Sequence, residues 1–370
     1  MLHLVVGQAS EWLRHERTPD HSRPHARPHR TQVRGESRSA CRGRSVEAGA
    51  TTWSRRDVEE DAMAVIGWIG LGHMGAPMAA HLVEAGHEVA GFDVDPRMAE
   101  RAASAGVRLV ADAATAAREA DAVFTSLPRS EHSRQVLIGD AEHTGLFDVV
   151  RRGTLVLDTS TVDVETARVC HEAAAARGIR FVDSPVSGGI AGAHAGSLTF
   201  MLGGDEEATS EAAALVQPMA GHVFVVGGPT AGIAAKLANN LMLFITLQAA
   251  SEGARLAEAL GLDPVVFHDL ATVSSGDSWP LRTWYPVPGV VETSPANRNF
   301  DATFTTRLAE KDLSYALAAG DAAGLDLAAG RLAMERFARL INEGYGDKDC
   351  SLVVKYVARD GRTAGFDPAA

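Results

Sequence analysis

Lys236 and Asn240 stand four residues apart in the apolar stretch GIAAKLANNL, residues 232–241. On a helix of about 100° per residue, their side chains lie about 40° apart and one turn along. The neighbouring residues are apolar on every side, so we expect a buried helix in which desolvation lowers the pKa of Lys236 towards neutrality. Such a lysine suits proton transfer to and from a substrate hydroxyl. The alternative is that Lys236 extends to a surface while Asn240 caps a neighbouring element.

A glycine-rich stretch near the start of the apolar pattern points to nucleotide binding. It has the form Gly-x-Gly-x-x-Gly and consists of Gly70, Leu71, Gly72, His73, Met74 and Gly75. It follows the apolar run AVIGWI and opens a helical pattern, and Asp93 ends the next apolar run, 18 residues after Gly75. In this context the glycines let the backbone approach a pyrophosphate at a helix N-terminus. The alternative is a tight turn without a ligand, but the complete fingerprint favours a dinucleotide.

Asp93 also indicates which dinucleotide is bound. A carboxylate at this position accepts hydrogen bonds from a ribose 2′-hydroxyl and repels a 2′-phosphate. The next residues, Val94 and Asp95, offer no cation, although Arg97 is near. We therefore expect NAD rather than NADP. Asp95, directly before Pro96, is the better candidate for the N-cap of the following helix.

Three further groups of residues follow the ends of predicted strands. They are Leu127-Pro128, Ser160-Thr161 and Ser187-Gly188-Gly189. The carboxyl edge of a parallel sheet is where ligands bind in such folds. In the third group, a hydroxyl beside two amides that carry no side chain suits a carboxylate. Ordinary turn chemistry is the alternative for each group.

The elements that position these residues form two different patterns. Strands alternate with helices from residue 64 to residue 228, which predicts an α/β domain with a doubly wound parallel sheet of the Rossmann type. From residue 229 the pattern is helical, beginning with one long segment, 229–259, that joins the two halves. We therefore expect an NAD-binding domain over 63–228, an all-α substrate and dimerisation domain over 229–358, and a flexible tail over 359–370. The irregular, proline-rich residues 280–303 form a long loop of the kind that is often functional.

The first 62 residues differ in composition from the rest of the chain. They are rich in Arg, His and Pro and lack an apolar period, so we expect either a disordered extension or a start of translation at Met63. They hold eleven Arg against nine Asp and Glu, so the formal net charge of −12 for the whole chain leaves about −14 on the remainder, which disfavours nucleic acid as a partner. By sequence we expect no apolar run of the length of a membrane span. Three scattered cysteines and no metal-spaced histidines predict a reducing, cytoplasmic compartment and no metal site.

Several motifs together resemble the 3-hydroxyacid dehydrogenase family. IGLGHMGAPMAAHL is similar to its nucleotide-binding signature, VDSPVSGGIAGAHAGSLTFMLGG to its substrate-binding signature, and GIAAKLANN carries its Gly-x-x-x-Lys-x-x-x-Asn pattern. The resemblance runs from about Ala64 to Tyr356. The segments SSGDSW, YPVPGV and GYGDKDCS, with the Lys-Asp-Leu run between them, resemble the 3-hydroxyisobutyrate branch.

The resemblance implies roles for individual residues. Lys236 would be the catalytic acid and base, Asn240 would orient the substrate, and Ser187, Gly188 and Gly189 would hold the substrate carboxylate. From the residues alone, Lys311 reads as a solvated helix residue beside Asp312; the resemblance makes it a cofactor contact. Leu127, Pro128 and Thr161 would line the nicotinamide side. Relatives often place Asn where this chain has His132, so a cofactor contact at that position is not implied.

The function implied is NAD-dependent oxidation of 3-hydroxyisobutyrate to methylmalonate semialdehyde, a step of valine breakdown, in a homodimer or homotetramer. A related enzyme alternative acts on tartronate, succinic or malonic semialdehyde. A non-enzymatic alternative is an NAD(H)-binding scaffold or sensor. The presence of both Lys236 and Asn240 favours an enzyme.

Overall fold

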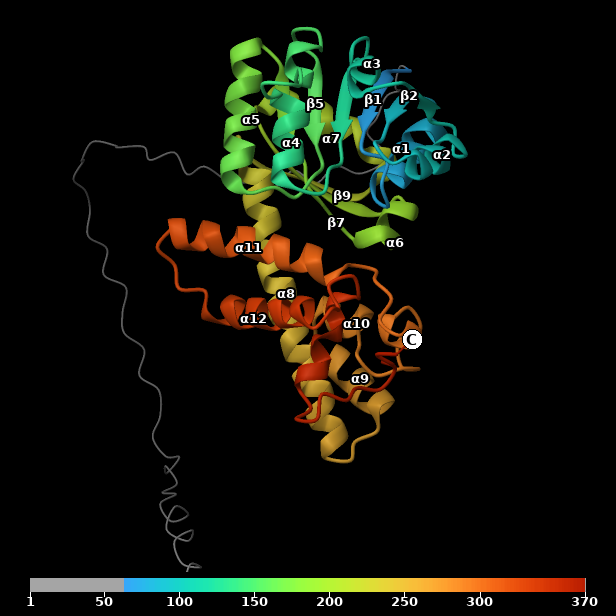
Figure 1. The fold of residues 1–370 in the computed structure, drawn as a ribbon, viewed down its shortest axis with the longest axis vertical. Helices are drawn as coiled ribbons and strands as arrows, with labels where there is room; N and C mark the ends of the chain where they lie inside the picture. The colour runs from blue at the N-terminus through green and yellow to red at the C-terminus, as the bar shows by residue number, and fades with distance from the viewer. Residues whose placement is uncertain (1–62, 370) are drawn as a thin grey trace, which may run out of the picture. The chain divides into compact units, whose positions relative to one another are not determined.

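The computed structural model describes residues 63–369, so the extension predicted over residues 1–62 lies outside the described part. Its first half alternates strands and helices (Figure 1). The strands are β1 Val65–Ile69, β2 Glu88–Phe92, β3 Arg108–Leu109, β4 Ala122–Thr125, β5 Leu155–Asp158, β6 Arg180–Asp183, β7 Val186–Ser187, β8 Leu198–Gly203 and β9 Ala220–Gly227. The helices are α1 Gly75–Glu84, α2 Pro96–Ala103, α3 Ala113–Ala117, α4 Ser130–Ile138, α5 Val164–Arg177, α6 Gly189–His194 and α7 Glu206–Leu215.

The nine strands form one sheet in the order β3-β2-β1-β4-β5-β6-β8-β7, with β9 paired to β8. The ladders from β3 to β6 are parallel, and so is the β8–β9 ladder. β8 runs antiparallel to both β6 and β7. The predicted doubly wound α/β domain is confirmed, with an antiparallel turn-back at β8 that the sequence pattern did not indicate.

The central strands β1, β4 and β5 are buried on both faces of the sheet. Successive side chains of each strand point to opposite faces, so each strand contributes to two cores. Trp68 of β1 and Phe124 of β4 stack in the core on one face, with ring centroids 4.8 Å apart. Ile69 and Val123, their chain neighbours, lie in a separate core on the other face. The continuous apolar strands of the sequence therefore fold as two-sided, buried strands.

The second half is helical from Ala231 onwards. Its helices are α8 Ala231–Ala259, α9 Pro264–Thr272, α10 Trp279–Thr283, α11 Thr306–Ala322 and α12 Ala328–Asn342, with short 3-10 turns at Pro295–Arg298 and Cys350–Tyr356. Phe244, Phe300 and Phe337, each fully buried, lie in its main core. Residues 359–369, predicted as a flexible tail, contact this half through Phe366, whose ring packs edge-on against those of Phe300 and Tyr345.

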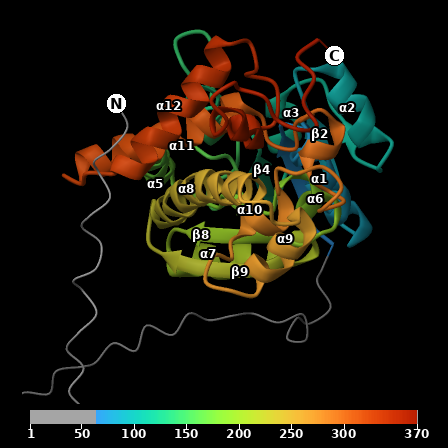
Figure 2. The same ribbon diagram turned by 90° about the horizontal axis from the view of Figure 1, so that it is seen from below.

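Helix α8 starts against the sheet and continues into the helical half, where α10, α11 and α12 pack against it (Figures 1 and 2). By length and composition α8 is apolar enough to span a membrane, contrary to the expectation from the sequence. Its buried residues, however, face β8 and the neighbouring helices, as in the core helix of a folded domain.

One expectation for α8 was wrong. The sequence suggested burial on all sides, but Ala234, Ala238 and Met242 are exposed, with Met242 67% accessible. The sheet and helices α10 to α12 cover only the side that carries Lys236 and Asn240. An apolar stripe therefore remains uncovered in the single chain, and apolarity alone did not reveal which side would be covered.

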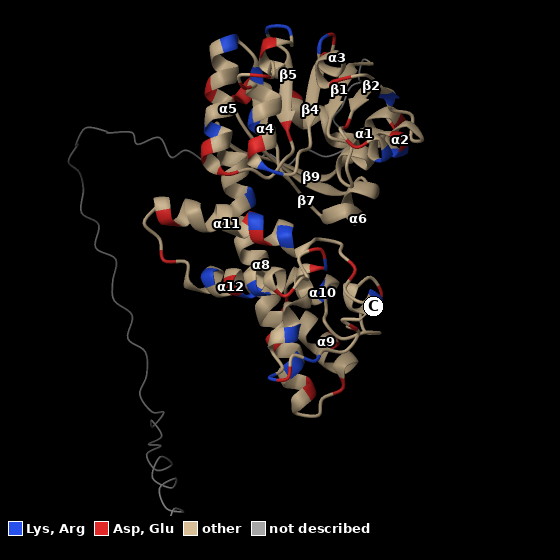
Figure 3. Cartoon of the chain, in the orientation of Figure 1, with Lys and Arg blue, Asp and Glu red and all other residues tan. Residues whose placement is uncertain are grey.

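Charged side chains of both signs are distributed along outer helices such as α5 and α12 (Figure 3). Many form short-range ion pairs, for example Arg168 with Glu165 on α5 and Arg339 with Glu343 at the end of α12.

Candidate functional site

The turn between β1 and α1 has the geometry of a dinucleotide-binding loop. Gly70 has φ +93°, and a Cβ at Gly75 would lie 1.9 Å from the Gly70 carbonyl oxygen, so both positions require glycine. A Cβ at Gly72 would meet nothing within 4 Å, which leaves the backbone there open to a ligand. Helix α1 has no side-chain cap at Met74, so its first N–H groups are available to a phosphate. The loop therefore fits the pyrophosphate of a dinucleotide.

Asp93 follows β2 and is held against this loop. Its carboxylate accepts hydrogen bonds from the backbone N–H of Leu71 (2.6 Å) and of Asp95 (2.8 Å). Arg97, the nearby cation, is engaged by Asp95 through both its Nε (3.1 Å) and a terminal nitrogen (2.8 Å). The pKa of Asp95 is lowered by these hydrogen bonds from Arg97. The Asp93 carboxylate, beside an Arg97 that is already paired with Asp95, favours a ribose hydroxyl over a 2′-phosphate.

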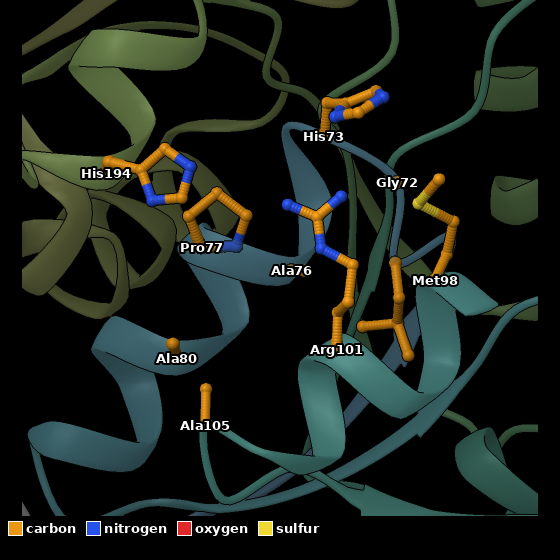
Figure 4. A pocket seen from close by; sticks show the side chains of 10 residues that line it. Gly72, His73, Ala76, Pro77, Ala80, Met98, Arg101, Ala105 and His194 are labelled. Carbon is orange, nitrogen blue, oxygen red and sulfur yellow. The ribbon is translucent and has the colours of Figure 1, made fainter.

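A hollow of about 160 Å³ lies beside the same loop, between α1 and α2 (Figure 4). Arg101 of α2 extends towards Gly72 and His73, and His194 of α6 lies next to Pro77 on the opposite side. Arg101 thus adds positive charge next to the N-terminal end of α1, where the helix dipole already favours an anion.

The carboxyl ends of β4 and β5 form the next part of the site. Asp158 is buried at the end of β5, where burial raises its pKa, and it accepts hydrogen bonds from Thr125 Oγ1 (2.8 Å) and the Ser160 N–H (3.0 Å). Ser160 Oγ in turn accepts from the Leu127 N–H at 2.7 Å. This network fixes the two loops that contain the predicted nicotinamide-side residues.

Lys311 of α11 contacts these two loops. Its Nζ donates to the carbonyl oxygens of Pro128 (3.0 Å) and Thr161 (2.8 Å) and lies 3.1 Å from Asp312 Oδ1. The expectation from the residues alone, a solvated lysine, was wrong: Lys311 is only 5% exposed. The structure brings Lys311 together with Pro128 and Thr161, a contact that the sequence did not indicate. The contact of Lys311 with a cofactor, which the resemblance implied, stays a prediction. His132 is exposed on α4.

Asp312 connects Lys311 to the residues on α8. Its Oδ2 accepts from Asn240 Nδ2 at 2.7 Å, and Asn240 Oδ1 accepts from Asn239 Nδ2 at 3.1 Å. Both Asn240 and Asp312 are almost completely buried. The orientation of the Asn240 amide is therefore fixed from both ends, and Asn239, which the sequence left unexplained, has a role in fixing it.

Lys236 is 7% exposed on the same side of α8. Desolvation lowers its pKa to about 8, against a smaller raising effect of Asp312, and Lys311 lowers it further. Within residues 63–369 its Nζ makes no hydrogen bond to protein, so the nitrogen is free to meet a substrate. The lowered pKa expected from the apolar sequence is present, and with it the capacity to donate and accept a proton near neutral pH.

The Ser187 loop turns sharply between β7 and α6. Gly188 and Gly189 have φ values of +131° and +64°, which favour glycine, and both are exposed. Ser187 is half-buried and pairs with Thr199 of β8. Four residues upstream, Asp183 binds the start of α8, so the loop and Lys236 are attached to the same junction.

The sequence reasoning missed Asp312 and Asp183. Asp312 was read only as a neighbour of Lys311, although its partner Asn240 is 72 positions away. Asp183 lies inside the quoted motif VDSP but was given no role. A buried carboxylate directly after an apolar strand is the signal that could have identified Asp183.

Two family models match most of the described chain. The NAD binding domain of 6-phosphogluconate dehydrogenase matches residues 65–227, and the NAD-binding domain of NADP-dependent 3-hydroxyisobutyrate dehydrogenase matches residues 230–357. A probable 3-hydroxyisobutyrate dehydrogenase of Mycobacterium tuberculosis is 41% identical over 292 residues, covering 79% of this chain and 97% of the relative. The chain belongs to the 3-hydroxyacid dehydrogenase family.

This dehydrogenase is NAD-dependent, in keeping with its loop and with its relatives. An NAD-dependent L-serine dehydrogenase of Pseudomonas aeruginosa is 39% identical over 293 residues, covering 79% of this chain and 97% of the relative. The solved structure of Mycobacterium tuberculosis 3-hydroxyisobutyrate dehydrogenase with L-serine matches with a TM-score of 0.73 and 40% identity, covering 80% of this chain and 99% of that one.

Proposed function

We propose that the protein oxidises 3-hydroxyisobutyrate to methylmalonate semialdehyde with NAD as acceptor, and that Lys236 is the general acid and base. The observation that carries the proposal is a buried lysine with a pKa of about 8, one helical turn from a fixed carboxamide. Neutral Lys236 can accept the hydroxyl proton of a substrate at physiological pH, and protonated Lys236 can return it in the reverse reaction.

The other residues bind and orient the substrate. Ser187 and the amides of Gly188 and Gly189 hold its carboxylate, and Asn240 directs its hydroxyl carbon towards the nicotinamide side of the site. Lys236 takes the hydroxyl proton as the C–H bond of that carbon breaks. NAD, when bound, supplies the acceptor for the hydride. The charge balances because one proton and one hydride leave the alcohol to give the aldehyde.

L-serine is a second candidate substrate, favoured by two of the relatives described above. It carries an ammonium where 3-hydroxyisobutyrate carries a methyl group. Asp312 is the carboxylate whose charge acts on Lys236, and both of its oxygens already accept from Asn240 and Lys311. A carboxylate so engaged offers little to a substrate ammonium, which supports the methyl-bearing substrate.

A substrate panel tests the proposal. NAD reduction is measured with (S)-3-hydroxyisobutyrate, L-serine and 4-hydroxybutyrate, and the first is expected to have the highest kcat/KM. A higher kcat/KM with L-serine would replace the substrate assignment but keep the mechanism. Activity with NADP equal to that with NAD would overturn the proposed role of Asp93 in cofactor choice.

A Lys236→Ala variant tests the mechanism separately. Its kcat is expected to fall by about 10²- to 10⁴-fold, with NADH affinity retained, because a general acid and base contributes this much. Lys348→Ala is the matched control, since Lys348 forms only an exposed ion pair with Asp301. Turnover by Lys236→Ala at the rate of Lys348→Ala would exclude the proposed mechanism.

The proposal extends to the setting of the enzyme. We place the reaction in valine breakdown in the cytoplasm, where the described cysteines, Cys170 and Cys350, would stay reduced; both are free and buried. We also propose a homodimer or homotetramer, because apolar side chains remain exposed on α8 and α9. The more exposed of them are Met242, Leu256, Val266 and Leu270, and Leu260 at the C-cap of α8 is exposed as well.

A further inference from the structure

Helix α8 begins at a residue in an unfavourable backbone conformation. Thr230, at the N-cap position, has φ +73° in the left-handed region, which is rare for a β-branched residue. Its side chain forms no capping hydrogen bond, so the first turn of α8 is not satisfied by its own N-cap residue. Strained residues of this kind persist where the surrounding structure holds them in place.

Asp183, at the end of β6, supplies the missing cap from the sheet. Its Oδ1 accepts from the Thr230 N–H at 3.0 Å, and its Oδ2 accepts from the Ile233 N–H at 2.7 Å. The carboxylate is 1% exposed, and its charge opposes the positive end of a 29-residue helix. These two bonds connect strands of the first half directly to the start of α8.

The contact is close because glycine occupies both sides of it. A Cβ at Gly232 would lie 2.4 Å from the carbonyl oxygens of Asp183 and Met201, and a Cβ at Gly203 would lie 2.4 Å from the Gly232 nitrogen. No side chain fits between the strand ends and the helix. Backbone contact thereby limits the axial position of α8, and the two hydrogen bonds to Asp183 join its first turn to β6.

His171 of α5 holds the carboxylate from the other side. Its Nε2 lies 2.7 Å from Asp183 Oδ1, and its ring packs edge-on against Phe181 at 4.7 Å. The carboxylate thus has three partners from two helices, which fixes its two oxygens for the two backbone donors.

We propose that Asp183 is a positioning residue for catalysis, which sets the rotation of α8 and so directs Lys236 and Asn240 into the site. Lys236 is three residues after Ile233 and Asn240 is one turn further, so a rotation of the first turns would move both side chains together. The inference rests on the proposed role of Lys236.

Asp183→Asn tests the inference. A carboxamide keeps one acceptor but turns an NH2 group towards the Thr230 or the Ile233 N–H, so one of the two bonds is lost. We expect kcat to fall about 10- to 100-fold, with KM for NAD within about twofold of wild type, because small misplacements of catalytic groups cost this much. His171→Ala leaves both backbone bonds and should lower kcat less, in the same direction.

The pH profile provides a readout that general destabilisation would not change. Asp312 and Lys311 of α11 are the charged groups that act on Lys236, and neither is substituted in the variant. A displaced, better-hydrated Lys236 should move the rising limb of kcat for oxidation to higher pH. Asp263→Asn is the matched control, because Asp263 caps α9 through two backbone N–H groups far along the chain from the site residues.

The outcomes separate this inference from the proposed function. Wild-type kcat and pH profile in Asp183→Asn would overturn the positioning role, as would equal losses in Asp183→Asn and Asp263→Asn. If Asp183→Asn does not fold, an unchanged kcat and pH profile in His171→Ala overturns it. Full activity of Lys236→Ala would instead defeat the proposed function, whatever Asp183→Asn does.

Discussion

The two buried lysines, Lys236 and Lys311, differ in how their charges are matched. Lys311 has a carboxylate and two carbonyl oxygens as partners, whereas Lys236 has an open Nζ. Lys311 is suited to joining α11 to the loops after β4 and β5, whereas Lys236 is suited to exchanging a proton. Asp312 acts on both lysines, so a substitution of this carboxylate should affect both the loop contacts of Lys311 and the pKa of Lys236.

The pH dependence of turnover follows from the lowered pKa of Lys236. In the proposed mechanism oxidation requires the neutral amine, so kcat for oxidation should rise with pH through about 8 and level off above it. Reduction requires the ammonium, so kcat for that direction should fall as pH rises through the same value. Steady-state rates in both directions between pH 6 and 10 check this; parallel profiles in the two directions would contradict it.

Asp312→Ala should weaken both the site and the fold. The buried Lys311 ammonium and Asn240 amide lose their carboxylate, which we expect to lower the free energy of unfolding by about 3 to 5 kcal/mol. Because Asp312 raises the pKa of Lys236, its removal should move the rising limb of oxidation below that of wild type. Urea unfolding and pH profiles measure the two effects. An unshifted limb would show that Asp312 does not act on Lys236.

The sequence allowed part of this site to be predicted at the level of residues. Helical spacing paired Lys236 with Asn240, and the glycine pattern located the dinucleotide loop, because both are local relations. The bonds of Asp312 to Asn240 and of Asp183 to Ile233 join residues 72 and 50 positions apart. Such bonds depend on how helices pack, which a local pattern does not encode.

Among the elements, α8 serves three purposes along one axis. Its start is fixed to the sheet, its second and third turns carry the proposed catalytic pair, and its later turns form the core of the helical half. The bounds of α8 could be predicted from the sequence because the Ala/Leu pattern is long and ends before Gly261. Which side of α8 is exposed could not be predicted, since the same apolar residue types occur in a core and at a subunit contact.

Gly232→Ala should disturb α8 at its start. The added Cβ would meet two carbonyl oxygens at 2.4 Å, so the helix must shift, which we expect to cost about 1 to 3 kcal/mol and to lower kcat. Gly253→Ala is the control on the same helix, where the nearest side-chain atom is 4.0 Å away and stability should rise by up to about 1 kcal/mol. Thermal unfolding and kcat are measured for both variants. Equal changes in stability for Gly232→Ala and Gly253→Ala would refute the argument that Gly232 is required by its close contacts.

On the scale of the whole molecule, the exposed apolar side chains of α8 and α9 predict self-association. Light scattering should give a mass of two or four times the 39.0 kDa chain. The double variant Val266→Glu, Leu270→Lys should shift the mass towards one chain, since it places charge on two residues that are 65% and 56% exposed. Glu119→Lys, on the sheet-containing half, is the control. A monomeric wild type would rule out the proposed oligomer.

The scarcity of lysine has a practical consequence for chemical labelling. The chain contains four lysines, and Lys348 and Lys355 form ion pairs with Asp301 and Glu343, while Lys311 is held by its three partners. Lys236 combines an unbonded Nζ with a pKa of about 8, so near that pH it is the most nucleophilic side-chain amine among them. A small acylating reagent that reaches the site should therefore mark Lys236 before the other three lysines, and mass spectrometry of one peptide would report how completely NADH and substrate shield it.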